Sequence, residues 1–390
     1  MEKPKIRFKG YQEDWEQRKL DDVVEFLDTM RKPLEGAKRI SGPYPYYGAS
    51  GIVDYVDGYL FDEELILLSE DGANITDRNY PVCFLASGKY WVNNHAHVLR
   101  TKQENENNFI CNSLERKDYT QYNTGMAMPK LNKETCKKIP ILCPGFEEQK
   151  KIGDYFRSLD NLITLHQRKC EEMKILKKYM LQKMFPQNGQ LVPQIRFSGF
   201  TEDWEQRKLG EVCSEIGDGL HSAPEYDDNG KFYFINGNNL INGHIVINSK
   251  ETKRVSEKTF EKNNKQLDDN TVLLSINGTI GNLAYYQGEP VMLGKSAAYL
   301  KANKIDKTFL YSLLQTTAVM NNFMLSLTGT TIKNLGLDAI KNTKISIPEL
   351  HEQKKIGLYF SQLDNLITLH QQKCDELRNI KKFMLQNMFI

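Results

Sequence analysis

Histidine and lysine side chains occur at two spacings that could bind a metal ion or a phosphate group. His95 and His97 form a His-x-His pair, and Gly294 opens a Gly-Lys-Ser sequence that resembles the end of a phosphate-binding P-loop. A metal site needs three or four ligands, and no further ligand follows the His-x-His pair at a suitable spacing. The P-loop pattern needs a glycine where this chain has Glu289. The sequence therefore predicts neither a metal ion nor a nucleotide phosphate at these positions.

Motifs of DNA-modifying and DNA-cleaving enzymes are missing from the sequence. It has no Asn/Asp-Pro-Pro-aromatic motif for amino-methylation, no glycine-rich cofactor loop before a helix, and no acidic cluster followed by Glu-x-Lys. We therefore expect a chain that catalyses no reaction by itself. The alternative is a divergent stand-alone DNA methyltransferase or nuclease.

Other polar side chains are of the types that contact nucleic acids. Base edges are recognised by Arg, Lys, Asn, Gln, Ser and Thr on exposed loops, and phosphates by the same types and by backbone amides. In the C-terminal half the candidates are Thr330, Thr331, Lys333, His221 and Ser222. In the N-terminal half they are Lys130, Asn93, Asn94, His95, Tyr46 and Tyr47, with the tyrosines as groups that stack or contact the backbone. Each residue taken singly is explained equally well as a solvated loop or turn residue.

The composition is that of an ordinary globular protein, with 40% hydrophobic and 26% charged residues among 390. The net charge is only +2, so any phosphate-binding surface must gather basic residues locally or rely on partner subunits. Seven cysteines form no Cys-x-x-Cys pair, which indicates a reducing, cytoplasmic location. No segment approaches the ~20 apolar residues that span a bilayer, so we expect no membrane contact.

Two internal repeats organise the chain. Residues 4–20 recur at 193–209 with 13 of 17 positions identical, and residues 148–185 recur at 352–389 with 27 of 38 identical. The segments between them, about 26–139 and 216–343, are unrelated over most of their length. Repeated segments that flank two unrelated segments predict a pseudo-two-fold protein. In it, the repeats form the same scaffold twice and the unrelated segments form two different modules.

The longer repeat has the spacing of a coiled-coil helix. Apolar or small side chains recur in steps of four and three, at Ile152, Phe156, Leu159, Ile163, His166, Cys170 and Met173, and again at Ile356, Phe360, Leu363, Ile367, His370, Cys374 and Leu377. A helix of this length is roughly 57 Å long. We expect the two helices to pair with each other, antiparallel, as a spacer. The His and Cys positions are interpreted as polar residues that fix the register, in preference to a metal site.

The unlike middle segments are predicted to be mixed α/β modules with short strands. Aromatic and β-branched runs end in Asp-Gly or Asn-Gly, which marks turns and hairpins. The apolar spacing also predicts a single helix near 307–325. The fold class is therefore α+β, with two globular mixed α/β domains separated by two long antiparallel coiled-coil helices. The predicted boundaries are 1–146 and 190–350 for the domains, and 147–189 and 351–390 for the helices.

These repeats and three local motifs resemble the specificity subunits of type I restriction–modification systems over essentially the whole chain. The motifs are the helix entry at 347–356, Ile-Pro-Glu-Leu-His-Glu-Gln-Lys-Lys-Ile, the opening at 199–212, and Thr328-Gly-Thr-Thr-Ile-Lys-Asn-Leu. The first half departs from the third motif with Thr124-Gly-Met-Ala-Met-Pro-Lys. These two loops are only loosely alike, so we do not expect a role to carry over from one to the other.

The resemblance implies a division of labour. Each middle segment is a target recognition domain that reads one half of an asymmetric bipartite site in double-stranded DNA. The helices set the spacing and dock two methyltransferase subunits, and restriction subunits join that core. No cofactor is expected in this chain, because S-adenosylmethionine, ATP and Mg belong to the partner subunits. A coiled-coil scaffold protein without DNA preference is a further alternative, although it does not explain why the middles differ.

Overall fold

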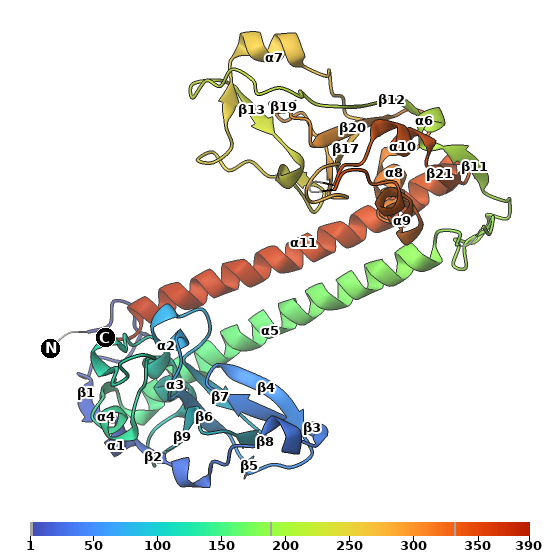
Figure 1. The fold of residues 1–390 in the computed structure, drawn as a ribbon. Helices are drawn as coiled ribbons and strands as arrows, with labels where there is room; N and C mark the ends of the chain where they lie inside the picture. The colour runs from blue at the N-terminus through green and yellow to red at the C-terminus, as the bar shows by residue number, and fades with distance from the viewer. Residues whose placement is uncertain (1–2, 188, 331–332) are drawn as a thin grey trace. The chain divides into compact units, whose positions relative to one another are not determined.

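Two long helices and two compact units make up the computed structural model, which describes residues 3–187, 189–330 and 333–390. The first unit consists of Met1–Arg168 with Gln371–Ile390, and the second unit of Lys169–His370. Helices α5 (Phe146–Lys183) and α11 (Leu350–Asn387) each have one part in either unit. Figure 1 shows α5 in green and α11 in red.

The first unit contains two four-stranded sheets and a two-stranded ribbon. One sheet has the order β2-β9-β6-β7 and is antiparallel: β2 Val24–Phe26, β9 Ala96–Thr101, β6 Leu65–Ser69 and β7 Cys83–Ala86. The other has the order β4-β3-β8-β5: β4 Gly51–Val56, β3 Ser41–Gly48, β8 Lys89–Val92 and β5 Phe61–Asp62. The ribbon pairs β1 Glu16–Lys19 with β10 Pro140–Cys143. Its short helices are α1 Leu20–Val23, α2 Asn74–Asp77, α3 Asn107–Glu115 and α4 Lys133–Lys137, with 3-10 turns at Asp28–Met30, Gly36–Lys38 and Thr120–Tyr122.

The second unit repeats this plan with local differences. Its antiparallel sheet has the order β12-β20-β17-β18: β12 Cys213–Asp218, β20 Ala297–Ala302, β17 Thr271–Ser275 and β18 Leu283–Tyr285. Its second sheet has the order β16-β13-β19: β16 Arg254–Val255, β13 Phe232–Ile235 and β19 Val291–Leu293. Two ribbons pair β14 Leu240–Ile241 with β15 His244–Ile245, and β11 Glu205–Lys208 with β21 Lys344–Ile347. Its short helices are α6 Leu209–Val212, α7 Glu257–Asn263, α8 Lys307–Leu314, α9 Thr317–Leu325 and α10 Leu337–Asn342, with a 3-10 turn at Gly237–Asn239.

The single helix predicted near 307–325 is wrong, because the structure has two helices there. Helix α8 ends at Leu314 and α9 begins at Thr317. Between them, Thr316 donates both its backbone N–H (3.0 Å) and its hydroxyl (2.7 Å) to the carbonyl oxygen of Leu313. A threonine hydroxyl that bonds a nearby carbonyl competes with the helical hydrogen-bond ladder, and here the pattern of apolar residues did not reveal the turn.

The long helices pack against each other in antiparallel orientation within each unit. In the first unit Lys381 on α11 forms a 2.6 Å salt bridge with Asp160 on α5. In the second unit Lys177 on α5 forms a 2.6 Å salt bridge with Asp364 on α11. The predicted coiled-coil positions are largely buried, among them Ile152, Phe156, Leu159, Ile356, Phe360 and Leu363. The predicted α+β fold class with a paired helical spacer is therefore confirmed.

An aromatic cluster in each unit joins the short repeat to the end of a long helix. In the first unit Phe389, just after α11, packs on Trp15 (6.3 Å between ring centroids) and Phe109 (5.3 Å). In the second unit Phe185, just after α5, packs in the same way on Trp204 (5.9 Å). The second cluster also contains Phe309 and Phe360, and the first also contains Phe156. Each core thus contains the residue that follows one long helix and the beginning of the other.

Candidate nucleic-acid interface

The two histidines of the His-x-His pair have separate partners. The side chain of His95 is exposed and its Nδ1 lies 2.8 Å from Asp71 Oδ1. His97 is buried, with Nδ1 2.7 Å from Asp28 Oδ2 and Nε2 2.7 Å from the carbonyl oxygen of Leu131. His95 lies in the turn that precedes β9, whereas His97 lies on β9 itself. Among the described residues no group of three His, Cys, Asp or Glu side chains has metal-binding geometry.

The first-unit candidates gather along one edge, where strands β3, β6 and β8 end. The backbone N–H of Asn93, just after β8, donates to the carbonyl oxygen of Tyr47 on β3 (3.0 Å). Asn94 and His95 complete the turn into β9, and the N–H of Glu70 donates to the carbonyl oxygen of His95 (2.9 Å). These bonds bring residues from three separate segments side by side.

The loop that carries Lys130 is attached to the same edge. The N–H of Leu131 donates to the carbonyl oxygen of Glu70 (2.7 Å), and Lys130 Nζ lies 3.4 Å from Glu70 Oε1. Asp71 and Lys130 also form an isolated antiparallel bridge. We define the first loop edge as Gly48, Asp71, Asn93, Asn94, His95 and Lys130. The structure therefore brings together four of the sequence candidates: Asn93, Asn94, His95 and Lys130.

The two tyrosine candidates lie on β3 behind this edge. Tyr46 is only 1% exposed, and its hydroxyl accepts a 2.9 Å hydrogen bond from the N–H of Leu34. Arg39 lies over its ring at 4.6 Å. Tyr47 is half-buried and its ring contacts Phe84 and Tyr90. Both rings therefore support the strand that carries the edge.

Largely buried ion pairs next to the first loop edge involve Arg31, Glu70, His97 and Asp28. Arg31 donates to Glu70 Oε2 (2.6 Å) and to the carbonyl oxygen of Ala96 (2.7 Å). Burial on its own would lower the pKa of His97, but hydrogen bonds and the negative charge of Asp28 raise that pKa to about 10. His97 is therefore protonated at neutral pH and pairs with the Asp28 carboxylate.

The second unit has the same edge, formed by equivalent hydrogen bonds. The N–H of Gly294 donates to the carbonyl oxygen of Ile235 (2.8 Å), as Asn93 does to Tyr47. The N–H of Ile276 donates to the carbonyl oxygen of Ser296 (3.0 Å), and the N–H of Leu335 donates to that of Ile276 (2.9 Å). We define the second loop edge as the equivalent positions: Asn236, Asn277, Gly294, Lys295, Ser296 and Asn334. No position carries the same residue in the two edges.

The loop pair that the sequence suggested to be only loosely alike has a common stem. The N–H of Thr124 donates to the carbonyl oxygen of Lys130 (2.7 Å), and the N–H of Thr328 donates to that of Asn334 (3.0 Å). Both threonine hydroxyls bond the same carbonyl oxygens. The stems of the two loops are therefore closed by equivalent hydrogen bonds, and the sequences between the stems differ.

The second-unit candidates lie on or beside the second loop edge. Thr330 and Lys333 are exposed on the loop that ends at Asn334, whereas Thr331 lies outside the described residues. His221 and Ser222 are exposed as well, with His221 Nε2 2.8 Å from Asp218 Oδ2. They follow Leu220, whose N–H donates to the carbonyl oxygen of Leu293 (2.8 Å), next to Gly294.

None of the six residues of the second edge was a candidate from the sequence. Gly294, Lys295 and Ser296 belong to the Gly-Lys-Ser motif, which was considered only as a phosphate loop. The strand pairs β3–β8 and β13–β19 align residues 92–96 with 293–297, so that Lys295 is equivalent to Asn94. The signal in the sequence was an apolar residue followed, after one position, by two polar residues and Ala in both segments.

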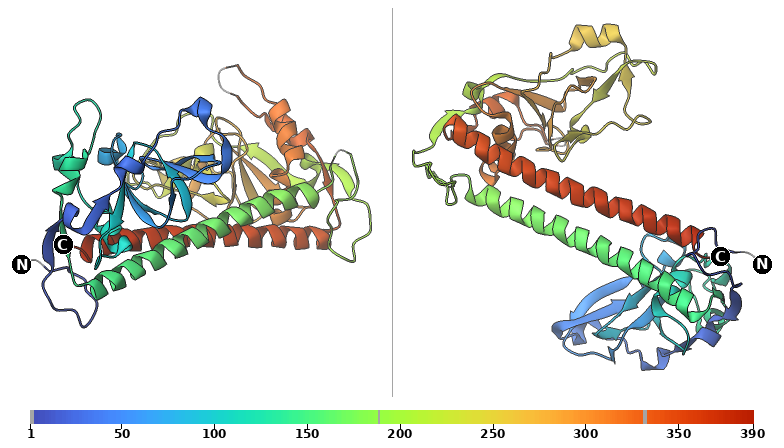
Figure 2. Two further views of the ribbon diagram at one scale, coloured as in Figure 1. Left: turned by 90° about the horizontal axis from the view of Figure 1, so that it is seen from below. Right: turned by 180° about the vertical axis from the view of Figure 1, so that it is seen from behind.

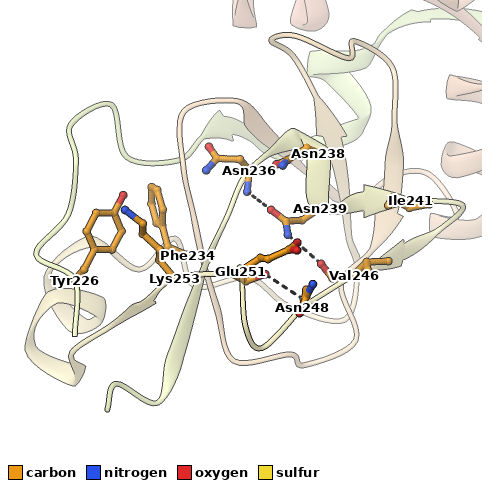
Figure 3. Close-up of a pocket in the computed structure, with 11 residues that line it drawn as sticks. Tyr226, Phe234, Asn236, Asn238, Asn239, Ile241, Val246, Asn248, Glu251 and Lys253 are labelled. Carbon is orange, nitrogen blue, oxygen red and sulfur yellow. Dashed lines mark hydrogen bonds between the residues drawn. The ribbon is translucent and has the colours of Figure 1, made fainter. Parts of the chain in front are cut away.

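Next to Asn236 the surface forms an open pocket of about 510 Å³. Figure 3 shows Asn236, Asn238 and Asn239 on one side and Tyr226, with Lys253 beside it, on the other. Lys253 Nζ lies 4.4 Å from the centre of the Tyr226 ring. Residues 248–265, which form one wall and continue beyond it, hold six basic and three acidic side chains, so positive charge accumulates here despite the near-neutral chain.

No helix in the described ranges is long and apolar enough to cross a membrane. All seven cysteines are buried, and none forms a disulfide among the described residues.

The sequence matches a known protein family over most of its length. The family described as "Type I restriction modification DNA specificity domain" matches residues 12–174 and 201–379. A putative type I restriction enzyme specificity subunit of Haemophilus influenzae, S.HindORF215P, is 28% identical over 92% of this chain and 89% of its own length. The MjaVIII specificity subunit of Methanocaldococcus jannaschii is 24% identical over 95% of this chain and 91% of its own.

Solved structures have the same fold. The crystal structure of a type I restriction–modification S subunit from M. genitalium superposes with a TM-score of 0.72 at 16% identity, over 100% of this chain and 99% of that chain. A structure described as the basis of complex assembly and conformational transition of the type I R-M system has a TM-score of 0.50 at 17% identity, over 97% and 98% of the two chains.

Proposed function

The chain belongs to the family of type I restriction–modification specificity subunits, which are non-catalytic, and from this membership we propose that each unit reads one half of an asymmetric bipartite DNA site. The single observation that supports this best is the pair of loop edges. They share a hydrogen-bonded backbone and differ at every side chain. A common frame with different exposed side chains is what two readers of two different sequences require.

The DNA-contacting residues proposed from the sequence remain proposals, and the structure supports them unequally. Lys130, Asn94, His95, Thr330, Lys333, His221 and Ser222 are exposed on or beside the edges. Tyr47 is half-buried and Asn93 is only 7% exposed. Tyr46 is fully buried, so its contribution would be to position β3. Thr331 stays a candidate on sequence grounds alone.

We further propose that the paired helices set the spacing of the half-sites and dock two methyltransferase subunits. Apolar side chains that are exposed in the chain recur at equivalent positions of the two helices. The first unit exposes Leu162, Leu165 and Phe383, and the second unit exposes Leu366, Leu369 and Tyr179. Two copies of one apolar surface fit two copies of one partner.

Restriction subunits would join this core, and S-adenosylmethionine, ATP and Mg would be bound by the partner subunits. We place the complex in the cytoplasm, in accord with seven cysteines that form no disulfide among the described residues.

Methylation mapping tests the proposed function. Methylated adenines would be mapped genome-wide in cells with the complete system and in cells that lack this chain. A two-part asymmetric motif that disappears on deletion supports the proposal. Replacement of residues 26–139 by the corresponding segment of another family member should change one half of the motif only, and a change in both halves or in neither contradicts it.

The alternative functions predict different results. A divergent methyltransferase or nuclease predicts methyl transfer or DNA cleavage by the purified chain without partners. A coiled-coil scaffold predicts no sequence preference even with methyltransferase subunits bound.

A further inference from the structure

An asparagine and a glycine face each other at the same place in the two loop edges, but on exchanged strands. In the first edge the glycine, Gly48, ends β3 and the asparagine, Asn93, follows β8. In the second edge the asparagine, Asn236, follows β13 and the glycine, Gly294, follows β19. The parallel pairing of β3 with β8 and of β13 with β19 establishes this equivalence, because Tyr47 pairs with Val92 just as Ile235 pairs with Leu293.

The glycine leaves room for the amide opposite it. A side chain at Gly48 would approach within 3.3 Å of Asn93 Nδ2, and a side chain at Gly294 would collide with Asn236 Oδ1. Each edge therefore has room for one asparagine side chain at this strand pair, in the space beside the glycine. In the first unit the asparagine follows β8, and in the second unit it follows β13, the equivalent of β3.

Both amides are held by their oxygen. Asn93 Oδ1 accepts a 2.8 Å hydrogen bond from the N–H of His95, and Asn236 Oδ1 accepts a 2.9 Å hydrogen bond from the hydroxyl of Ser296. His95 and Ser296 are themselves equivalent positions of the two edges. The donor therefore comes from equivalent positions of the two edges, but it is a backbone N–H in His95 and a side-chain hydroxyl in Ser296.

The amide nitrogens of these two residues have no hydrogen-bond acceptor within the part of the chain that the structure describes. Asn93 is 7% exposed, and its Nδ2 is not among the fully buried polar atoms that lack a partner in the described residues. A donor that keeps some access to the surface and has no acceptor in the described chain can donate to a ligand. An amide oxygen has a second lone pair, so each group can still donate and accept at once.

We propose that Asn93 and Asn236 are equivalent base-reading residues, each of which contacts one purine of its own half-site. This inference rests on the proposed function and specifies it. A carboxamide pairs with adenine by donating to N7 and accepting from the N6 amino group, which needs the free Nδ2 and the free lone pair described above. The amide is fixed by its oxygen before DNA arrives, so its orientation is already set.

The pocket beside Asn236 extends the second contact surface. Asn238 is exposed on its wall (Figure 3), and its amide makes no hydrogen bond to the described residues. Lys253, at the opposite side of the pocket, provides a positive charge for a phosphate. Asn236 therefore lies where the second loop edge, which has an equivalent in the first unit, meets the pocket of the second unit.

Asparagine-to-aspartate substitutions separate base reading from a structural role. Asn93→Asp and Asn236→Asp keep an acceptor oxygen for His95 and Ser296 but replace the free donor by an acceptor. Each variant would be produced with its methyltransferase and restriction subunits in cells that lack the native chain, and methylated adenines would be mapped. We expect about a tenfold loss of discrimination at one base position, in one half-site for Asn93→Asp and in the other half-site for Asn236→Asp. Asn303→Asp, an exposed asparagine without side-chain hydrogen bonds among the described residues, is the matched control.

A transposed variant tests whether position in space matters more than position in sequence. Asn93→Gly alone should relax the motif, and Gly48→Asn combined with Asn93→Gly should restore it, because the amide then reaches the site from the other strand. The backbone at Gly48 is not in the left-handed region, and the nearest side chain, Val53, is exposed and free to rotate.

Failure of the asparagine contacts and failure of the proposed function give different methylation patterns. An unchanged motif in both aspartate variants overturns the inference while the native chain still specifies a two-part motif. Complete loss of methylation in an aspartate variant supports the inference if the transposed variant restores the motif, and counts against it if the transposed variant does not. If the native chain itself specifies no motif, the proposed function fails first.

Discussion

Lys381 Nζ lies 2.6 Å from Asp160 Oδ1, and this salt bridge between the two long helices recurs in the second unit as Lys177 with Asp364. In the long repeat, Asp160 is equivalent to Asp364 and Lys177 is equivalent to Lys381. The same ion pair therefore forms twice between the antiparallel helices. An antiparallel pair whose contacts are related in this way has a unique register, because a shift by one heptad would separate both ion pairs at once.

Charge reversal at this ion pair should destabilise the helix pair by about 1 kcal/mol. Lys381→Glu places two acidic groups face to face, and the double variant Lys381→Glu with Asp160→Lys should recover most of the loss. Chemical unfolding of the native chain, Lys381→Glu, Asp160→Lys and the double variant, analysed as a double-mutant cycle, gives the coupling. Lys382→Glu, an exposed neighbour without an ion pair among the described residues, should have little effect.

Phe389→Ala should destabilise the first unit by about 3–5 kcal/mol, because it empties an aromatic site between Trp15, Phe109 and Phe156. Phe383→Ala, six residues earlier and within α11, removes a ring that is 55% exposed and should cost less than about 1 kcal/mol. Urea unfolding monitored by tryptophan fluorescence compares the two. Equal effects would mean that the end of α11 is not part of the core.

The first unit should lose stability at alkaline pH through His97. Its pKa rises from 6.5 in the unfolded chain to about 10 in the folded unit, despite the opposing effect of burial, because of its hydrogen bond to Asp28 and the charge of that carboxylate. A raised folded-state pKa means that the stabilisation is complete below pH 6.5 and is lost progressively as the pH rises to about 10. In His97→Gln the first unit should be less stable at pH 7, and the decline over this window should be reduced. A decline of equal size in both proteins would assign it to other groups.

The proposed docking of two partner copies predicts a stepwise loss of stoichiometry. Leu162→Glu in the first unit and Leu366→Glu in the second should each remove one methyltransferase subunit, because a carboxylate replaces an equivalent exposed leucine. Native mass spectrometry of the purified complex should show one bound copy for each single variant and none for the double variant. Two bound copies in the double variant would refute docking at these residues.

The longer repeat predicted the helix pair because apolar residues at heptad spacing report directly on a helical seam. Trp15 and Trp204 lie at matching positions of the short repeat, and both are buried. The loop edges could not be assigned in the same way. Their equivalence depends on strand pairing between distant segments, and the side chains that sequence comparison relies on are the ones that differ.

The asparagine–glycine exchange illustrates this limit. Asn93 was a candidate from its sequence, whereas Asn236 was not, because the two occupy different strands and align with a glycine in each case. Tyr46 was a candidate from the sequence as well, and in the structure its side chain is buried and its hydroxyl accepts a hydrogen bond from the N–H of Leu34. Register and the direction of a side chain come from tertiary pairing, which short sequence windows do not contain.

The aromatic residue after each long helix also determines the order in which the chain can fold during synthesis. The second unit, Lys169–His370, is complete once its last residue has left the ribosome. The first unit begins at the N-terminus but waits for Phe389 and for the carbonyl oxygen of Ile390, which accepts a hydrogen bond from Arg116. The residues before α5 are therefore synthesised before the second unit but complete their own unit after it, and truncation of the chain before Phe389 would damage the first unit.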